Sequence, residues 1–359
     1  MQTRTALRIS TAPPSAGVNH VIGIEPRQLS LLNRRFIFLI VNLASSAAAR
    51  PVSIAALGEC MLELQGAAFG QLRQTFGGDT LNTAVYLARC GGHRLRVHYA
   101  TALGDDSLST GLLARWAAEG VHTGLVQRLP GRLPGLYLIE LDDSGERRFH
   151  YWRGQAAARS YFDTATTALE SQADALDALY LSGISLAILP PSGRERVLAL
   201  MARMRAAGKV VAFDNNFRPR LWESAADARY WYGRAFASAS IALITADDHQ
   251  ALNGLPDLDA GVRAAQALPV AEIAIKCGAR PTRVGLGGAW HEVATEAVPR
   301  VVDTTAAGDS FAAGYLSQRL AGVVPAEAAA FGNRVAARVI QHPGALIPRE
   351  AMPDLMAVA

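Results

Sequence analysis

Short apolar runs alternate with amphipathic stretches along most of this chain. The first apolar run, Val52-Ser53-Ile54-Ala55-Ala56-Leu57, ends at Gly58-Glu59. Further strands are predicted at residues 98–102, 178–181, 210–213, 241–245 and 272–276, and helices at 81–90, 108–119, 194–207 and 261–268. This alternation predicts βαβ units and therefore an α/β fold with a doubly wound, mostly parallel sheet flanked by helices.

Two segments, about 62–76 and 131–153, depart from this rhythm. Apolar and polar residues alternate with a period of two in these segments, and turn residues are frequent. Asp142-Asp143-Ser144-Gly145 lies between two alternating runs, which is typical of a β-hairpin. We expect these segments to form a small β unit beside the main sheet.

The first fifty residues differ from the rest of the chain. Residues 1–33 are polar and show no sustained period, and an apolar run at 36–43 follows Arg34-Arg35. A basic flank, an apolar run and small residues resemble a signal peptide. However, the run is shorter than the roughly 20 residues that span a membrane, and it starts far from Met1. We therefore favour a disordered N-terminal extension over residues 1–50, ahead of one domain over residues 51–359.

Composition and charge narrow the functional classes. Half of the 359 residues are hydrophobic, which suffices for a large core. Residues 1–50 carry six Arg and one Glu, so the formal net charge of +4 leaves −1 on the remainder. That remainder has no basic field for nucleic acid. Cys60, Cys90 and Cys277 lack metal-like spacing and are expected to be free thiols.

The stretch Asp303-Thr304-Thr305-Ala306-Ala307-Gly308-Asp309-Ser310 is the most informative in the chain. It follows an apolar run at 297–302, expected to be a strand, and precedes a helical pattern from Phe311. Small residues at a helix N-terminus let an anion approach the unpaired N–H groups. An acid there, Asp309, could take a proton from a hydroxyl nucleophile. The alternative is an ordinary turn with Asp309 in the first helical turn, where acids are favoured anyway.

This stretch resembles the signature D-T-x-G-A-G-D of the ribokinase-like (PfkB) carbohydrate kinases. Ala306 stands where the family commonly has Gly. The resemblance implies that Asp303 anchors the loop and that Asp309 is the catalytic base. Ala306, Ala307 and Gly308 would form the anion hole for the transferring phosphoryl group.

A second signature lies about 230 residues earlier, at Gly77-Gly78-Asp79-Thr80-Leu81-Asn82. It resembles the family's G-G-x-x-x-N, in the branch that phosphorylates 2-keto-3-deoxygluconate. On this basis Gly78 would give backbone access to a polyol, and Asp79 and Asn82 would read its hydroxyls. The alternative is that Asp79 or Thr80 only caps the helix.

The loop after the strand at 210–213 reads Asp214-Asn215-Asn216-Phe217-Arg218-Pro219. Ligands bind at the carboxyl ends of strands in doubly wound folds, and an Arg fork suits a carboxylate. Similarity to the same branch implies that Arg218 meets the substrate carboxylate. It also implies that Tyr137, Tyr151 and Arg153, on a β lid formed by 62–76 and 131–153, face the sugar acid. The alternatives are a surface ion pair for Arg218 and simple packing for the aromatic side chains.

The residues expected to bind the nucleotide form less distinctive motifs. Lys276, Gly278 and Ala279 resemble the family's K-x-G-x-x-G nucleotide loop, although Pro281 replaces the final Gly. Asn333 matches a position that borders adenine. Asp248 stands in for the glutamate linked to magnesium. A P-loop motif is absent from the sequence.

Together these resemblances imply a 2-keto-3-deoxygluconate kinase that uses ATP and Mg²⁺, with a possible monovalent cation. Its partners would be small molecules, with neither nucleic acid nor a membrane among them. We expect a cytoplasmic enzyme that can form a homo-oligomer. Two alternatives stay open: another sugar kinase of the fructokinase or ribokinase type, and a non-catalytic sugar-acid sensor.

Overall fold

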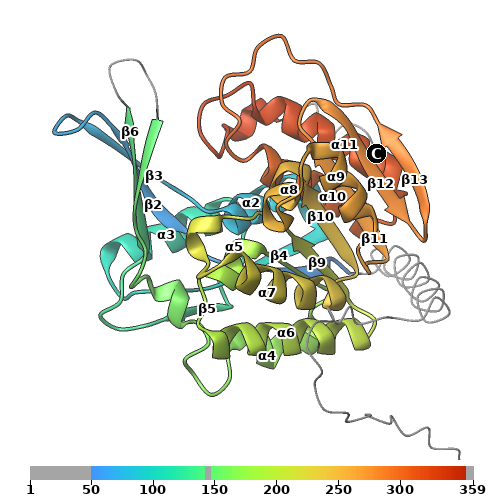
Figure 1. Cartoon of the computed structure of the whole chain (residues 1–359). Helices are drawn as coiled ribbons and strands as arrows, with labels where there is room; N and C mark the ends of the chain where they lie inside the picture. Colours follow the sequence, from blue (N-terminus) through green and yellow to red (C-terminus); the bar gives the residue numbers. More distant parts are fainter. Residues whose placement is uncertain (1–49, 142–146, 353–359) are drawn as a thin grey trace, which may run out of the picture.

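The computed structural model describes residues 50–141 and 147–352, and its centre is a nine-stranded sheet (Figure 1). The strand order is β13-β12-β11-β10-β9-β8-β1-β4-β5. All neighbours pair in parallel except β11–β12 and β12–β13. The strands are β1 (Val52–Leu57), β4 (Leu95–Leu103), β5 (Val126–Arg128), β8 (Ala178–Ser182), β9 (Val210–Asp214), β10 (Ile241–Thr245), β11 (Glu272–Cys277), β12 (Arg280–Leu286) and β13 (Ala289–Val293).

Helices cover both faces of this sheet. Alternate residues of β1 show the division, because Ile54 packs with one buried cluster and Ala55 with the other. The first cluster takes in α2 (Asp79–Gly91), α10 (Ala307–Leu320) and α11 (Pro325–Val339). The second takes in α6 (Pro191–Ala206) and α7 (Ala225–Ser238). The other helices are α3 (Ser107–Ala118), α4 (Ala168–Gln172), α5 (Gly183–Ala187), α8 (Ala246–Asn253) and α9 (Leu258–Gln266).

A second, four-stranded sheet stands to one side of this body (Figure 1). Its order is β3-β2-β6-β7, with β2 parallel to β6 and the outer pairs antiparallel. The strands are β2 (Met61–Gly66), β3 (Leu72–Gly77), β6 (Gly135–Leu141) and β7 (Arg147–Trp152). Only residues 58–60 separate β1 from β2, so the two sheets meet at this short connection.

The predicted fold class is confirmed: a mostly parallel sheet flanked by helices, with a smaller sheet beside it. The strand expected at 297–302 was wrong. Val301 and Val302 are exposed, Pro299 lacks a donor, and the Val302 amide donates to the Ile340 carbonyl at the end of α11. Of the extension expected at 1–50, residues 1–49 lie outside the described residues, as does the hairpin tip at 142–145, whereas Arg50 pairs with Asp177 (2.7 Å). No helix of the described part is long and apolar enough to cross a membrane.

Two glycines allow α10 and α11 to pack closely. A Cβ on Gly314 would lie 2.9 Å from the Cα of Gly332. A Cβ on Gly332 would lie 3.0 Å from the carbonyl oxygen of Phe311. Because backbone atoms cannot move aside as side chains do, this helix pair depends on the absence of both Cβ atoms.

We predict that Gly314→Ala lowers the free energy of unfolding by about 1–3 kcal/mol, since the added methyl group overpacks the helix contact. The matched control is Gly233→Ala on α7, where the glycine is exposed and a Cβ meets nothing within 4 Å. The control should stabilise the protein by roughly 0.5–1 kcal/mol through helix propensity. Urea unfolding of both variants measures the difference, and equal effects would contradict the close contact.

Candidate active site

The N-terminus of α10, with Ala306, Ala307, Gly308 and Asp309, has the backbone geometry expected of an anion site, and we call it the anion cradle. The Asp303 carboxylate accepts hydrogen bonds from the amides of Thr305 (2.9 Å) and Gly344 (3.0 Å), which fixes the loop ahead of the helix. Ala306 then turns the chain in the left-handed region (φ 62°, ψ 14°), and α10 begins at Ala307. No side chain caps this helix end. The Ala307 amide donates to the Thr304 carbonyl (3.1 Å), so the amides of Gly308 and Asp309 are the ones left for an anion.

Asp309 lies in the first turn of α10 and faces the start of α2. The Asn82 amide donates to its carboxylate (2.9 Å) across 227 residues of sequence. Burial, together with the nearby Asp79 carboxylate, raises the pKa of Asp309 to about 7, although Asn82 opposes the shift. A carboxylate with a pKa close to neutrality is well matched to general base catalysis.

Asp79 is held by the carboxyl ends of two strands. Its carboxylate accepts hydrogen bonds from Ser182, at the end of β8, and from Asn216, after β9 (2.6 Å). The carboxyl ends of parallel strands thus meet the N-termini of α2 and α10, as in other doubly wound folds. This explains how signatures far apart in sequence form one site.

Lys276 comes to the same place from β11. Its ammonium group donates to the Asp214 carboxylate (2.8 Å) and would lie 3.4 Å from a Cβ on Gly308. Burial raises the pKa of Asp214, and Lys276 opposes that shift. A single lysine therefore lies beside the anion cradle, among acidic side chains.

The second sheet brings aromatic side chains to this site. The Tyr137 hydroxyl donates to Glu63, and it would lie 2.9 Å from a Cβ on Gly77. Tyr151 is half-exposed and stacks on Tyr137 with ring centroids 5.9 Å apart. Arg153, just after β7, forms a buried ion pair with Glu59.

The two signature glycines have a packing role. A Cβ on Gly78 would lie 2.1 Å from the carbonyl oxygen of Glu59. Gly77, by the contact given above, leaves room for Tyr137. The absence of side chains therefore lets α2 approach both the connection between β1 and β2 and the second sheet.

Arg218 lies in the loop after β9, where its half-exposed side chain donates to both carboxylate oxygens of Asp248 (3.2 Å each). Asp248 also accepts from the Phe217 amide (3.2 Å). Arg218 thus forms the ion pair with a local acid that the sequence offered as an alternative. Asp248 is already engaged, which weakens its assignment to magnesium.

Comparison with known proteins agrees with this geometry. The model of the pfkB family of carbohydrate kinases matches residues 52–352. This chain belongs to that family. It is 48% identical to the 2-dehydro-3-deoxygluconokinase of Dickeya dadantii, over 84% of this chain and 98% of that protein. The enzyme of the same name from Haemophilus influenzae is 40% identical, with 85% and 98% covered.

Solved structures show the same fold. The fructokinase of Xylella fastidiosa with bound ATP has a TM-score of 0.70 at 25% identity, over 84% of this chain and 95% of that one. The 2-dehydro-3-deoxygluconokinase of Thermotoga maritima has a TM-score of 0.71 at 20% identity, over 85% and 99%. At 20% identity the second likeness concerns the fold alone.

Gly278, Ala279 and Asn333, which match the PfkB nucleotide site, make none of the contacts described above for the anion cradle. Gly278 and Ala279 form the exposed two-residue turn between β11 and β12, and Gly278 adopts φ 62° there. Asn333 is buried. It accepts from Thr282 (2.9 Å) and donates to the Ala294 carbonyl (3.0 Å), so it ties α11 to the strands.

Within residues 50–141 and 147–352, no three His, Cys, Asp or Glu side chains gather into a group able to hold a metal ion. Mg²⁺ is commonly held by one or two carboxylates together with nucleotide phosphates. An ion shared with the ATP phosphates would need only one or two protein carboxylates, so the described residues are compatible with Mg²⁺ held mainly through ATP.

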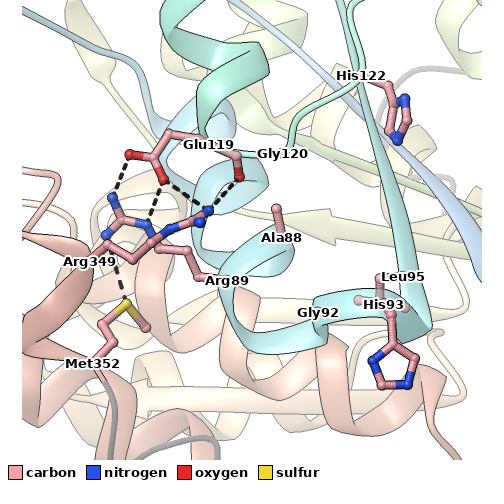
Figure 2. A pocket seen from close by; sticks show the side chains of 10 residues that line it. All are labelled: Ala88, Arg89, Gly92, His93, Leu95, Glu119, Gly120, His122, Arg349 and Met352. Atoms are coloured by element: carbon pink, nitrogen blue, oxygen red, sulfur yellow. Dashed lines mark hydrogen bonds and ion pairs between the residues drawn. The ribbon is translucent and has the colours of Figure 1, made fainter.

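A pocket of about 520 Å³ lies at the opposite end of α2 (Figure 2). Figure 2 shows Arg89 and Arg349 both directed at Glu119. Arg89 donates to the carboxylate (2.7 and 2.9 Å) and to the Ile347 carbonyl (2.7 Å). These contacts hold residues near the end of the described chain against α2, and Arg349 also pairs with Glu119 (3.7 Å), so both arginines of the pocket are engaged.

Several site residues were missed in the sequence. Glu59 lies in the connection that follows β1, and Glu63 lies within β2. Ser182, Asp214 and Asn216 lie at or just after the carboxyl ends of β8 and β9. An acid directly after a buried strand, as in Gly58-Glu59, was an available signal.

Ala306 occupies a backbone region that costs an L-residue with a Cβ about 1–2 kcal/mol. We predict that Ala306→Gly raises the free energy of unfolding by up to about 1 kcal/mol, because glycine's greater freedom in the unfolded chain offsets part of the gain. Ala307→Gly is the control, since Ala307 is helical and its replacement should destabilise the protein. Chemical denaturation decides, and a destabilised Ala306→Gly would contradict the left-handed geometry.

Proposed function

We propose that this chain is a 2-keto-3-deoxygluconate kinase, also named 2-dehydro-3-deoxygluconokinase. It transfers the γ-phosphoryl group of ATP to the terminal hydroxyl of the sugar acid, giving 2-keto-3-deoxy-6-phosphogluconate. The observation that carries this proposal is the 40–48% identity, over 84–85% of the chain, to proteins of that name. Asp309 and its anion cradle supply the chemistry that such a transfer needs.

Asp309 acts as the general base. Its carboxylate removes the proton of the attacking hydroxyl as the bond to phosphorus forms. The amides of Gly308 and Asp309, with Ala306 and Ala307 beside them, stabilise the charge on the transferring group. Lys276 adds a positive charge next to Gly308. Asn82 orients the carboxylate through the hydrogen bond described above.

Sugar kinases of this family use ATP with a divalent metal ion, typically Mg²⁺, which neutralises phosphate charge. In this chain, the N-terminus of α10 and Lys276 would receive the phosphates. We place the adenosine part of ATP toward the turn formed by Gly278 and Ala279. Asn333 would support this part of the site from the interior of the protein. Asp248 keeps only an indirect, magnesium-linked role in this scheme.

The sugar acid would lie between the second sheet and the starts of α2 and α10. Asp79 and Asn82 would bind hydroxyl groups there, with Gly78 giving the close approach. Tyr137 and Tyr151 would form one wall. Arg218 and Arg153 would hold the carboxylate end, since an Arg fork matches a carboxylate in charge and geometry. Closure of the second sheet as a lid would exclude water.

The alternatives have less support. A kinase of neutral sugars has no use for two arginines at one end of its substrate, and the fructokinase of Vibrio alginolyticus is 26% identical to this chain. A non-catalytic sensor has no need of a carboxylate whose pKa is raised to about 7.

Cytoplasmic location, a homo-oligomer and a monovalent-cation requirement stay predictions. Fractionation, light scattering and assays with potassium or choline salts measure them.

We predict that Arg218→Leu raises the KM for 2-keto-3-deoxygluconate at least about tenfold, because it removes a charge-assisted contact to the carboxylate. The KM for ATP should stay unchanged. Arg220→Leu is the matched control, because Arg220 is an exposed arginine of the same loop. Steady-state kinetics with the sugar acid and with fructose test this assignment. An equal rise in both variants, or comparable kcat/KM for fructose in the wild type, would contradict it.

We predict that kcat/KM falls about tenfold per pH unit below pH 7, because Asp309 must be ionised to accept the proton. Asp309→Asn should lose about 10²–10⁴-fold in turnover, since the amide keeps the shape but accepts no proton. Its residual activity should lack the inflection near pH 7. Thermal melts and ATP binding verify that the variant is folded. A variant with more than a tenth of the wild-type rate would rule out Asp309 as the base.

A further inference from the structure

Glu59 lies where the two sheets join. It belongs to the connection 58–60 between β1 and β2, and only 2% of its surface is exposed. Gly78 packs directly on its backbone carbonyl. The position of this carboxylate is therefore fixed both by the main sheet and by the start of α2, next to the proposed substrate site.

Glu59 forms a buried ion pair with Arg153, and the positive charge of Arg159 also acts on its carboxylate. Arg153 donates to one carboxylate oxygen, Oε2, through its Nη2 group. The two side chains are 12% and 1% exposed, respectively. A buried ion pair gains little net stability, because both charges lose hydration. Burial in fact raises the pKa of Glu59, while Arg153 opposes the shift. Stability alone is thus a weak reason for this pair.

Each member of the pair keeps an unused polar atom. Oε1 of Glu59 and Nε of Arg153 are both buried and have no hydrogen-bond partner among the described residues. Buried polar atoms in folded proteins are nearly always hydrogen-bonded, so two such atoms in one ion pair need an explanation. A bound carboxylate would accept from Nε, and a hydroxyl group would donate to Oε1.

We propose that Glu59 is the positioning residue of Arg153. Its carboxylate accepts from the Nη2 group of Arg153 and holds the guanidinium group in place. The Nε–H of Arg153 is thereby left to donate to the carboxylate of the sugar acid. This inference rests on the proposed function. Glu59 contributes to specificity through Arg153 and takes no part in proton transfer. The alternative is a purely structural tether between the second sheet and the main body.

The test compares Glu59→Ala, Glu59→Gln and Arg153→Ala, plus the Glu59→Ala/Arg153→Ala double variant, in the full chain. Glu59→Ala should raise the KM for 2-keto-3-deoxygluconate about tenfold or more, with kcat and the KM for ATP within about threefold. Glu59→Gln should restore the wild-type KM, because its amide oxygen still accepts from Nη2. In the Arg153→Ala background, Glu59→Ala should add less than about twofold, since the two residues act as one unit. Calorimetric titration of the sugar acid without ATP should rank the dissociation constants of the variants in the same order as their KM values.

Glu119→Ala is the matched control, because it removes the acid of the ion pair with Arg89 at the far end of α2. It should lower the melting temperature without changing the KM for the sugar acid. An unchanged KM in Glu59→Ala, an undiminished penalty in the Arg153→Ala background, or a Gln variant as impaired as Ala would overturn the inference. A wild type without activity on 2-keto-3-deoxygluconate would instead overturn the proposed function, so the two failures are distinguishable.

Discussion

The hydrogen bond between Asn82 and Asp309 joins the N-termini of α2 and α10, and the proposed chemistry depends on that junction. Helix N-termini attract anions, yet this one carries Asp309 with Asp79 close by. Burial and the nearby Asp79 carboxylate make the proton of Asp309 harder to lose. The same burial and neighbouring charge that raise the pKa of Asp309 make it a suitable base near neutral pH.

The surrounding structure holds these like charges together. Ser182 and Asn216 bind Asp79, and Lys276 binds Asp214, so these two acids have donors from neighbouring strand ends, while Asp309 has its donor, Asn82, on α2. The parallel sheet places those strand ends in a row. Close glycine contacts then bring the helices and the second sheet near enough to complete the site. The substrate would enter an arrangement in which charge, and not apolar shape, provides most of the recognition.

Local patterns predicted the fold class and the order of elements well. The strand at 241–245 and the helix at 81–90 could be predicted because their apolar positions follow the period of a strand and of a helix, respectively. The run at 297–302 shows where this reading fails. It is apolar, yet its backbone bonds to the end of α11 instead of to a neighbouring strand, and nothing in a local window reports such a partner.

The sequence by itself determined the family, and it predicted the anion cradle and the base, because these need particular small or acidic residues at fixed spacing around one helix start. Tertiary structure alone decided which distant groups meet there. The pairing of Glu59 with Arg153 spans 94 residues, and that of Asn82 with Asp309 spans 227. Such contacts follow from how the two sheets and the helix ends pack, and so do the burial and charge neighbours that set the pKa of Asp309. A linear pattern carries no distance between these groups, so their electrostatics come only with the folded chain.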